Sequence, residues 1–528
     1  MAVHNIERRK LLKNFGTLAL GAGASLAMPK SFATIANGLM PGSANQTAGI
    51  NAVNYKEAFN QALTNNPELI GFANTPDNFS PKQLQLEGKI PADLQGIFYR
   101  NGPGKHERGD IRYQHLFEGD GMLQRFEIAN GKVMHHGKFI TTPKYTNEQS
   151  AEKFLYSGPD TKLAHSLPVS SSDMVNAANT NVIPVGDDLW ALWEAGSPSV
   201  VDEKSLEFKQ FESLGAGTKY GKSLKGLPFS AHPKISPNGE IWNFGLSPSG
   251  HVVVYHLSAK GQVKNVGLIN AQYKGGMLHD FLMTDKHLLL ILPSLVTNPT
   301  TTGYFRRTEF DEKLPMKVVV VSKQTLKMTK SFELPAGFAF HYGNAWEESD
   351  GTIHFDASLY PNVDVLHKLS NVMQGQMNHA NAKSKTAFYT LKPSGSYDMH
   401  MLDSNTEFPR VCNHLVGLKN QYLYHLSANQ SSTKGHSLWS DTVSAIDTDS
   451  GKEQHYHFGH DYLVEEHVVV CPKKKEGTGY LIGTALHVPT KRTCLNVFSV
   501  ENITSGPVAR AWLPYHLPLG FHGNFKSA

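Results

Sequence analysis

Gly520-Phe521-His522-Gly523-Asn524, near the C-terminus, is one of four short settings in which this chain presents a histidine. The other three are Ser230-Ala231-His232-Pro233, Met277-Leu278-His279-Asp280 and Phe340-His341-Tyr342-Gly343-Asn344. These segments lie too far apart in the sequence for a single helix or loop to hold them together. Only a fold whose chain returns repeatedly to one axis could bring the four rings to one metal ion.

Four neutral imidazoles would suit Fe, Cu, Zn or Ni as a ligand set. The chain contains 26 histidines, however, so histidine alone carries little information. His232, between alanine and proline, could equally be a hydrogen-bonded core residue, and His279, before Asp280, could be a turn residue. The residues by themselves leave these interpretations open.

The composition is that of a globular protein. The chain has 528 residues, of which 40% are hydrophobic and 18% charged, enough apolar side chain to bury a core. The net charge of +4 is small and no basic run interleaves with aromatic residues, so nucleic acid is not an expected partner. Cys412, Cys471 and Cys494 show no CxxC spacing, so neither a disulfide framework nor a thiolate metal cluster is predicted.

The N-terminus has the pattern of an export signal. Glu7-Arg8-Arg9-Lys10-Leu11-Leu12-Lys13 is followed by an apolar stretch, residues 15–28, and by the small residues of Ser31-Phe32-Ala33. This order is typical of a secretory signal peptide, and the adjacent arginines are typical of the twin-arginine type. The apolar stretch is shorter than the roughly 20 residues that span a bilayer, so a membrane anchor is disfavoured. We therefore expect residues 1–33 to be a signal peptide and the protein to be exported, to the periplasm.

The rest of the chain is predicted to be mostly β-structure. Residues 34–70 are expected to form a flexible leader and N-terminal segment, with Tyr55–Asn65 as one of two helix candidates and residues 362–382 holding the other. From Pro81 onward, apolar runs of four to eight residues, rich in β-branched and aromatic side chains, alternate with Gly, Pro, Asn and Asp. One example of such a run is residues 287–292.

No shift of composition divides the chain after the leader, so residues 71–528 are predicted to form one all-β domain. A domain of this length is too large for one sandwich or simple barrel. Radial repetition, as in a propeller, accommodates that many strands without long exposed edges. The sequence shows no clean blade repeat, so periodicity alone supports the propeller only weakly.

Two further motifs make the sequence similar to a known family. Ile90-Pro91-Ala92-Asp93-Leu94-Gln95-Gly96-Ile97-Phe98-Tyr99-Arg100-Asn101-Gly102-Pro103 resembles the opening signature of the carotenoid cleavage oxygenases. His115-Leu116-Phe117-Glu118-Gly119-Asp120-Gly121-Met122-Leu123 resembles the next block of that family, with Glu118 where Asp is more usual. The four histidine settings then follow in the family's order. On these six motifs, from about Gly71 to the end, the chain is identified as a member of the family.

The resemblance implies a seven-bladed β-propeller in which a few helices and loops cap the active-site face. It also implies one Fe(II) per chain, held on the propeller axis by four histidines, with O2 as co-substrate. Matching motif by motif, the ligands would be His232, His279, His341 and His522. Histidine ligands usually donate their second N–H to a carboxylate that fixes the ring. Similarity places three such carboxylates at Glu194, Glu407 and Glu466.

The glutamates have alternatives of their own. Family members usually have Glu-Pro at the third position, whereas this chain has Glu466-His467, and Glu465 is an equally available carboxylate. Glu194 lies inside an apolar run, where it could instead be a buried carboxylate paired with an arginine. Glu407 could pair with Arg410.

The activity implied by the resemblance is dioxygenase cleavage of a conjugated carbon–carbon double bond, giving two carbonyl products. Carotenoids and apocarotenoids are the family's commonest substrates and are the preferred class here. A second branch cleaves stilbenes and needs polar groups that bind a phenol, for which Tyr113 and Lys144 lie roughly in place. A third interpretation is a binding protein that kept the propeller without the chemistry.

Members that act on carotenoids dip an apolar patch into lipid, so the resemblance also implies a peripheral membrane contact. Residues 288–296 are apolar enough to form such a patch. They follow closely on the His279 motif, however, and a buried central strand is the favoured interpretation.

Overall fold

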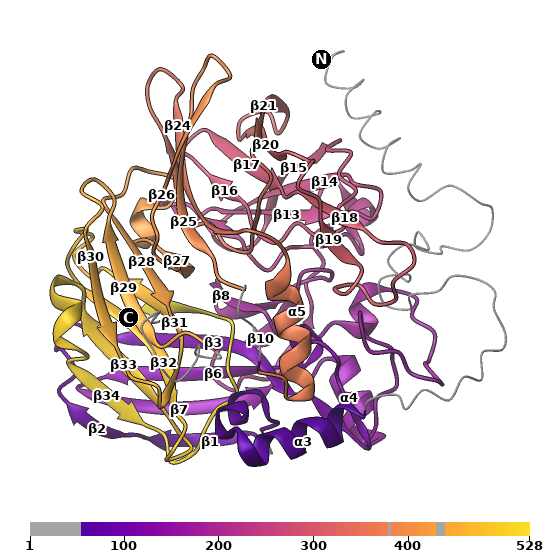
Figure 1. Ribbon diagram of the computed structural model, residues 1–528, viewed down its shortest axis with the longest axis vertical. Helices are drawn as coiled ribbons and strands as arrows, with labels where there is room; N and C mark the ends of the chain where they lie inside the picture. Colours follow the sequence, from indigo (N-terminus) through magenta and orange to yellow (C-terminus); the bar gives the residue numbers. More distant parts are fainter. Residues whose placement is uncertain (1–53, 76, 378–381, 429–438) are drawn as a thin grey trace.

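Short apolar runs build seven β-sheets of four or five strands, arranged as the blades of a propeller around one axis (Figure 1). The computed structural model describes residues 54–75, 77–377, 382–428 and 439–528. The predicted signal peptide and the first part of the leader lie outside these residues. No helix within the described ranges is both long and apolar enough to cross a membrane.

The first three blades are antiparallel sheets of five, four and four strands. Blade 1 contains β1 (Phe79–Gln83), β7 (Lys132–Phe139), β6 (Asp120–Ala129), β3 (Gly96–Lys105) and β35 (His522–Ser527). Blade 2 contains β11 (Phe208–Phe211), β10 (Ser199–Asp202), β9 (Asp188–Leu192) and β8 (Asn181–Val185). Blade 3 contains β12 (Lys234–Ile235), β13 (Ile241–Leu246), β14 (Val252–Leu257) and β15 (Val263–Ile269).

The other four blades follow in chain order. Blade 4 contains β16 (Leu282–Met283), β17 (His287–Leu292), β20 (Met316–Ser322) and β21 (Met328–Leu334). Blade 5 contains β22 (Phe338–Ala339), β23 (Ala345–Glu347), β24 (Ile353–Tyr360), β25 (Lys385–Leu391) and β26 (Tyr397–Met401). Blade 6 contains β27 (Glu407–Arg410), β28 (Tyr422–Ser427), β29 (Thr442–Asp447) and β30 (Glu453–His457). Blade 7 contains β31 (Tyr462–Val470), β32 (Tyr480–His487), β33 (Arg492–Ser499), β34 (Ala509–Trp512) and β2 (Gln85–Gly88).

Smaller elements connect the blades and cover one face of the propeller. Two short hairpins are β4 (Glu107–Arg108) with β5 (Ile111–Arg112), and β18 (Leu295–Thr297) with β19 (Thr308–Phe310). The α-helices described are α3 (Tyr55–Asn65), α4 (Pro143–Ser150) and α5 (Asp364–Asn371). The 3-10 turns are η1 (Pro67–Phe72), η2 (Leu116–Glu118), η3 (Ser172–Val175), η4 (Gly221–Leu224), η5 (Val372–Gln374), η6 (Asn413–Leu415) and η7 (Val500–Ser505).

Both ends of the described chain close the ring. The C-terminal strand β35 pairs with β3 in blade 1, and the early strand β2 pairs with β34 in blade 7 (Figure 1). The register of the first pair places His522 opposite Asn101. The closure therefore fixes the position of a histidine that lies seven residues from the C-terminus.

The interior lies between neighbouring blades, and β17 shows why its strands are apolar on both faces. Successive side chains of a strand point to opposite faces of the sheet. Leu289 and Ile291 pack toward blade 5, whereas Leu288 and Leu290 pack toward blade 3. All four are fully buried. The favoured interpretation of this segment as a buried central strand is confirmed, so β17 does not form an exposed patch.

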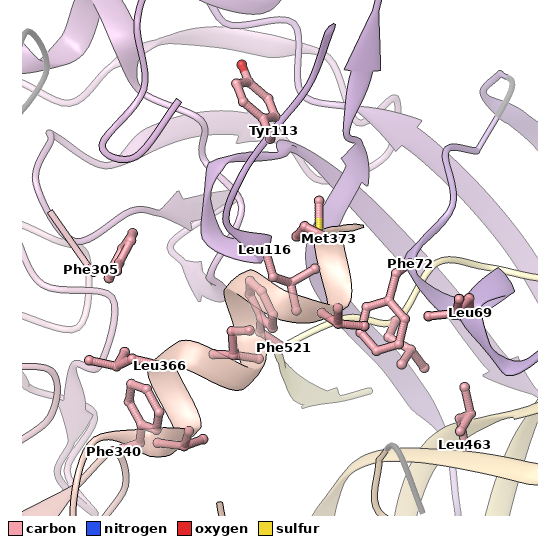
Figure 2. Close-up of a cluster of buried hydrophobic side chains, with 14 of the residues drawn as sticks. Leu69, Phe72, Tyr113, Leu116, Phe305, Phe340, Leu366, Met373, Leu463 and Phe521 are labelled. Atoms are coloured by element: carbon pink, nitrogen blue, oxygen red, sulfur yellow. The ribbon is translucent and has the colours of Figure 1, made fainter. Parts of the chain in front are cut away.

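The helices cover the face that holds the histidines. Leu69, Phe72, Leu366 and Met373, from η1, α5 and η5, gather in one apolar cluster with Phe521 (Figure 2). Both helix candidates of the sequence are present, as α3 and α5. Residues 55–70 of the predicted N-terminal segment form α3 and the start of η1, and their apolar side chains complete this cluster.

Cys412 and Cys471 form a disulfide between the loop after β27 and the end of β31. The spacing of the cysteines in the sequence does not predict this pair. The two cysteines are 59 residues apart and belong to neighbouring blades, so only the folded propeller brings them together. Cys494 is a free, buried thiol.

Candidate metal centre

Each of the four predicted ligands lies at an edge strand of a different blade. His232 precedes β12, His279 precedes β16, His341 follows β22 and His522 opens β35. These strands form the edge of each sheet that faces the propeller axis, since the opposite edge strands β21, β26 and β1 are largely exposed and β15 is only partly buried. The fold therefore brings together four residues that are far apart in the sequence.

The four rings form one buried cluster. The ring centroid of His232 lies 4.3 Å from that of His279 and 4.7 Å from that of His522, and His341 and His522 are 4.9 Å apart. Each ring offers one nitrogen, and these four nitrogens all lie within 4.8 Å of one another. This convergence is what a single metal ion requires.

The chemistry of the rings also fits a metal ion. The Nε2 atoms of His232 and His341 are buried and have no hydrogen-bond partner within the described part of the chain. A buried nitrogen without a hydrogen-bond partner lowers the stability of a protein unless a ligand or metal ion binds it. Burial lowers the pKa of His232 well below its usual range and that of His522 to about 4. Both rings are therefore neutral at physiological pH, which is the form that binds metals.

Glu407, at the start of β27, fixes the ring of His341. The Nδ1 atom of His341 lies 2.5 Å from Oε2 of Glu407, and the hydroxyl of Tyr360 donates to Oε1 at 2.7 Å. Burial alone would raise the pKa of this carboxyl, but the adjacent imidazole and the hydrogen bonds lower it. Glu407 is thus held as a carboxylate, and Nε2 of His341 is left facing the cluster.

Glu194, which follows β9, contacts Nδ1 of His279. Burial by itself lowers the pKa of His279, and the neighbouring carboxylate outweighs this effect and raises it. The ring also stacks on Phe117, with 6.3 Å between the ring centroids. The structure thus pairs Glu194 with a histidine rather than with an arginine.

Glu466, at a bulge in β31, binds the histidine of blade 1. Its Oε1 lies 3.1 Å from Nδ1 of His522, and Arg410 donates to both of its oxygens at 2.9 and 3.0 Å. Burial raises the pKa of Glu466, but Arg410 and His522 lower it well below its usual range. Glu465 points elsewhere: it forms a buried ion pair with Arg100 and accepts from the backbone N–H of Gly520 at 2.8 Å.

Every blade contributes one residue to this centre. Blades 1, 3, 4 and 5 supply the histidines, and blades 2, 6 and 7 supply Glu194, Glu407 and Glu466. His232 is the one histidine of the four without a glutamate contact among the described residues. A set of four imidazoles with three carboxylates that anchor the rings suits a divalent metal with open coordination positions.

A cavity of about 430 Å³ opens onto the cluster. His279, His341 and His522 form part of its wall. Much of the remaining wall is aromatic or apolar and comes from several blades and from α5: Phe117, Trp193, Phe244, Phe340, Val365 and Leu369. The size lies within the range of small-molecule sites. An apolar ligand of moderate size can therefore reach the metal centre.

Tyr113 and Lys144 lie together beside this cavity. The Nζ atom of Lys144 lies 2.8 Å from the hydroxyl of Tyr113, and both side chains are buried. They line a separate cavity of about 30 Å³ that shares Phe117 and Trp193 with the larger one. Burial raises the pKa of Tyr113 well above its usual range, so it stays protonated.

The sequence is matched by a family model described as retinal pigment epithelial membrane protein, over residues 72–527. This chain belongs to that family, the carotenoid cleavage oxygenases. The resemblance drawn from the six motifs is confirmed, as are the seven-bladed propeller and the assignment to a dioxygenase of this family.

Curated members of the family act on more than one class of alkene. Apocarotenoid-15,15'-oxygenase from Synechocystis sp. is 28% identical over 490 residues, covering 87% of this chain and 95% of that protein. Lignostilbene-alpha,beta-dioxygenase isozyme III from Sphingomonas paucimobilis is 27% identical, covering 84% of this chain and 94% of that protein. The crystal structure of cobalt-substituted Synechocystis apocarotenoid oxygenase superposes with a TM-score of 0.77 at 26% identity, covering 88% of this chain and 99% of that one.

Two residues of the centre were not predicted from the sequence. Arg410 was considered only as a partner of Glu407, whereas it binds Glu466 and the carbonyl oxygen of Gly523. Arg410 lies three residues after Glu407, and this closeness to a predicted anchoring residue could have indicated its role. Tyr360, at the end of an apolar run, carries no such signal.

Proposed function

We propose that this protein is a non-haem Fe(II) dioxygenase that cleaves a conjugated carbon–carbon double bond of a carotenoid or apocarotenoid. One O2 is consumed, the double bond is broken, and each of its carbons leaves as a carbonyl. The observation that carries the proposal is the apolar cavity of about 430 Å³ with three of the four histidines in its wall. One iron per chain, bound by the four histidines, would supply the electrons that activate O2.

The residues of the chain bind and orient the substrate. Phe117 and Phe340 lie against His279, with ring centroids 6.3 and 5.0 Å away. Flat aromatic faces suit a polyene. The reaction needs no acid–base pair. The side chains therefore contribute by selecting which double bond reaches the centre.

Cleavage of a phenolic stilbene is the second candidate, and it would depend on Tyr113 and Lys144 to bind the phenol. Lys144 has little to offer a phenol, because its three donors already bind Tyr113, Asp120 at 2.6 Å and Glu148 at 3.0 Å. The hydroxyl hydrogen of Tyr113 remains as a donor. This arrangement supports the carotenoid class over the stilbene class.

Parallel incubations separate the two candidates. With an apocarotenal and with a 4-hydroxystilbene under ¹⁸O2, we expect the iron-loaded protein to cleave the apocarotenal faster and to label both carbonyl products. Tyr113→Phe should leave apocarotenal cleavage within about twofold, because the lost hydroxyl does not line the main cavity. Cleavage of the stilbene alone, lost in Tyr113→Phe, would instead establish the second candidate. Products without label would contradict both.

We also propose that residues 1–33 export the folded protein to the periplasm, ahead of a propeller domain of residues 71–528. The disulfide between Cys412 and Cys471 supports export, because disulfides persist in oxidising compartments. Changing Arg8 and Arg9 together to lysine is expected to leave the full-length protein in the bacterial cytoplasm, as measured by fractionation. An unchanged periplasmic yield would contradict a twin-arginine signal.

A further inference from the structure

Lys368, on α5, is a half-buried lysine in the wall of the cavity that serves the metal centre. Its Nζ makes no hydrogen bond and no ion pair with any residue that the structure describes. The residues outside that description contain one acidic side chain, Glu7, in the predicted signal peptide. Other buried cations of this protein are paired, as Lys144 is with Asp120 and Arg100 with Glu465. Lys368 therefore differs from them in lacking a counter-charge.

The charges around Lys368 do not neutralise it. Glu407, across the cavity wall on β27, is already committed to His341 and Tyr360. Lys383 is a second positive charge nearby and opposes protonation of Lys368. On α5 itself, Asp364 lies 4.0 Å from His367 rather than in an ion pair with Lys368. Burial and Lys383 lower the pKa of Lys368 to about 8.

The cavity as a whole carries an excess of positive charge. Lys274, Arg307 and Lys368 line it, and the two carboxylates in its wall, Glu194 and Glu407, are each bound to a histidine. Lys274 is exposed to solvent, and the guanidinium of Arg307 lies over the ring of Tyr304, 5.9 Å from its centroid. Lys368, beside Val365 and Leu369 of α5, is the cation placed among the apolar residues.

We propose that Lys368 binds an ionised carboxylate at one end of the substrate, so that the preferred substrate is a conjugated alkene carrying an acid group. This inference rests on the proposed function and names the class of substrate more closely. An unpaired ammonium inside an apolar cavity gains most from a ligand that brings the missing charge and accepts its hydrogen bonds. The alkene lies on the aromatic wall beside the histidines while its acid end is held at α5. Lys368 is thus a residue that determines specificity by fixing the end of the substrate.

The test compares acids with their methyl esters. An apocarotenoic acid and a 4-hydroxystilbene-4′-carboxylic acid, each with its ester, cover both candidate alkenes. For Lys368→Met we expect the ratio of kcat/KM for acid over ester to fall roughly ten- to a hundredfold, the range for a hydrogen bond to a charged group. Lys368→Arg should retain most of the preference, and Lys260→Met, which removes an exposed lysine outside the cavity wall, should leave it unchanged.

The pH dependence provides a readout that a merely structural role would not change. Lys368 is charged below a pH of about 8 and loses its charge above it, while the substrate carboxylate stays ionised. The preference of the wild-type protein for the acid should therefore be present at pH 7 and decline as the pH rises through about 8. In Lys368→Arg it should persist to higher pH, because arginine stays protonated.

Binding measured without turnover separates this inference from the proposed function. Trp193 and Trp439 line the cavity, so their fluorescence reports binding to the iron-loaded protein in the absence of O2. Tighter binding of the acid that depends on Lys368 supports the inference even if no alkene is cleaved. Equal changes for acid and ester in Lys368→Met, in binding and in turnover, would overturn it. Thermal unfolding of each variant shows whether the fold is retained.

Discussion

Replacing His279 by alanine is expected to abolish iron binding and alkene cleavage together. His279 supplies one of four nitrogens that lie within 4.8 Å of one another, and its ring packs against Phe117 and Phe340. Alanine leaves three imidazoles and a gap that water can enter. We expect the iron content to fall from one per chain to a small fraction, and turnover to fall by more than about a thousandfold, since the metal supplies several kcal/mol of activation. Metal analysis after anaerobic reconstitution, with product assays, measures both.

His354→Ala is the matched control for this experiment. His354 lies on β24, where it stacks on Trp346 with 3.9 Å between ring centroids and bonds to Glu348. It belongs neither to the histidine cluster nor to the cavity wall. Its removal should change neither iron content nor turnover. A wild-type protein that takes up no iron would instead favour the interpretation as a propeller that binds ligands without chemistry. Iron retained in His279→Ala would show that the ligand set is different.

The ligand set could be predicted from the sequence because each histidine lies in a short motif next to a strand edge. The start of β35 leaves no room for a larger residue at Gly523, since the chain there approaches other backbone closely. A Cβ on Gly523 would lie 2.5 Å from the carbonyl oxygen of Tyr99. The short motif thus reflects a steric constraint on the backbone, and the family resemblance indicates that the histidine beside it is a metal ligand. The distances between the four histidine rings could not be predicted from the motifs, because the closed propeller sets them.

The remaining features depend on packing between blades, which short motifs do not record. The disulfide joins Cys412 and Cys471 across two blades, with no spacing that marks it. The cavity wall combines residues of separate blades with α5, so Lys368 had no sequence signal. Residues 34 to about 54 were expected to be flexible because they are rich in Gly, Ala and Asn. Beyond that point Phe59 and Leu69 are buried against α5 and η5, which composition alone does not indicate.

Alanine variants of Glu465 and Glu466 are expected to have different defects, although the sequence did not show which of the two orients His522. Glu466 bonds to His522 and Arg410, whereas Glu465 pairs with Arg100 and the N–H of Gly520. Glu466→Ala removes the acceptor that orients a ligand ring, and such changes typically weaken metal affinity about ten- to a hundredfold. Glu465→Ala leaves a buried arginine without its partner, which costs roughly 3–5 kcal/mol of stability.

Glu466→Ala should therefore mainly weaken iron binding, and Glu465→Ala should mainly lower the stability of the fold. Competition with a chelator is expected to show weaker iron binding in Glu466→Ala and near-normal affinity in Glu465→Ala. Urea unfolding of the iron-free proteins is expected to show the larger loss of stability in Glu465→Ala, because Arg100 is buried whereas the side chain of Arg410 is 25% exposed. The reverse pattern would mean that Glu465 orients His522. Since alternate residues of a strand face opposite sides, a shift of one residue at the bulge in β31 would produce that reversal, and the assay pair detects it.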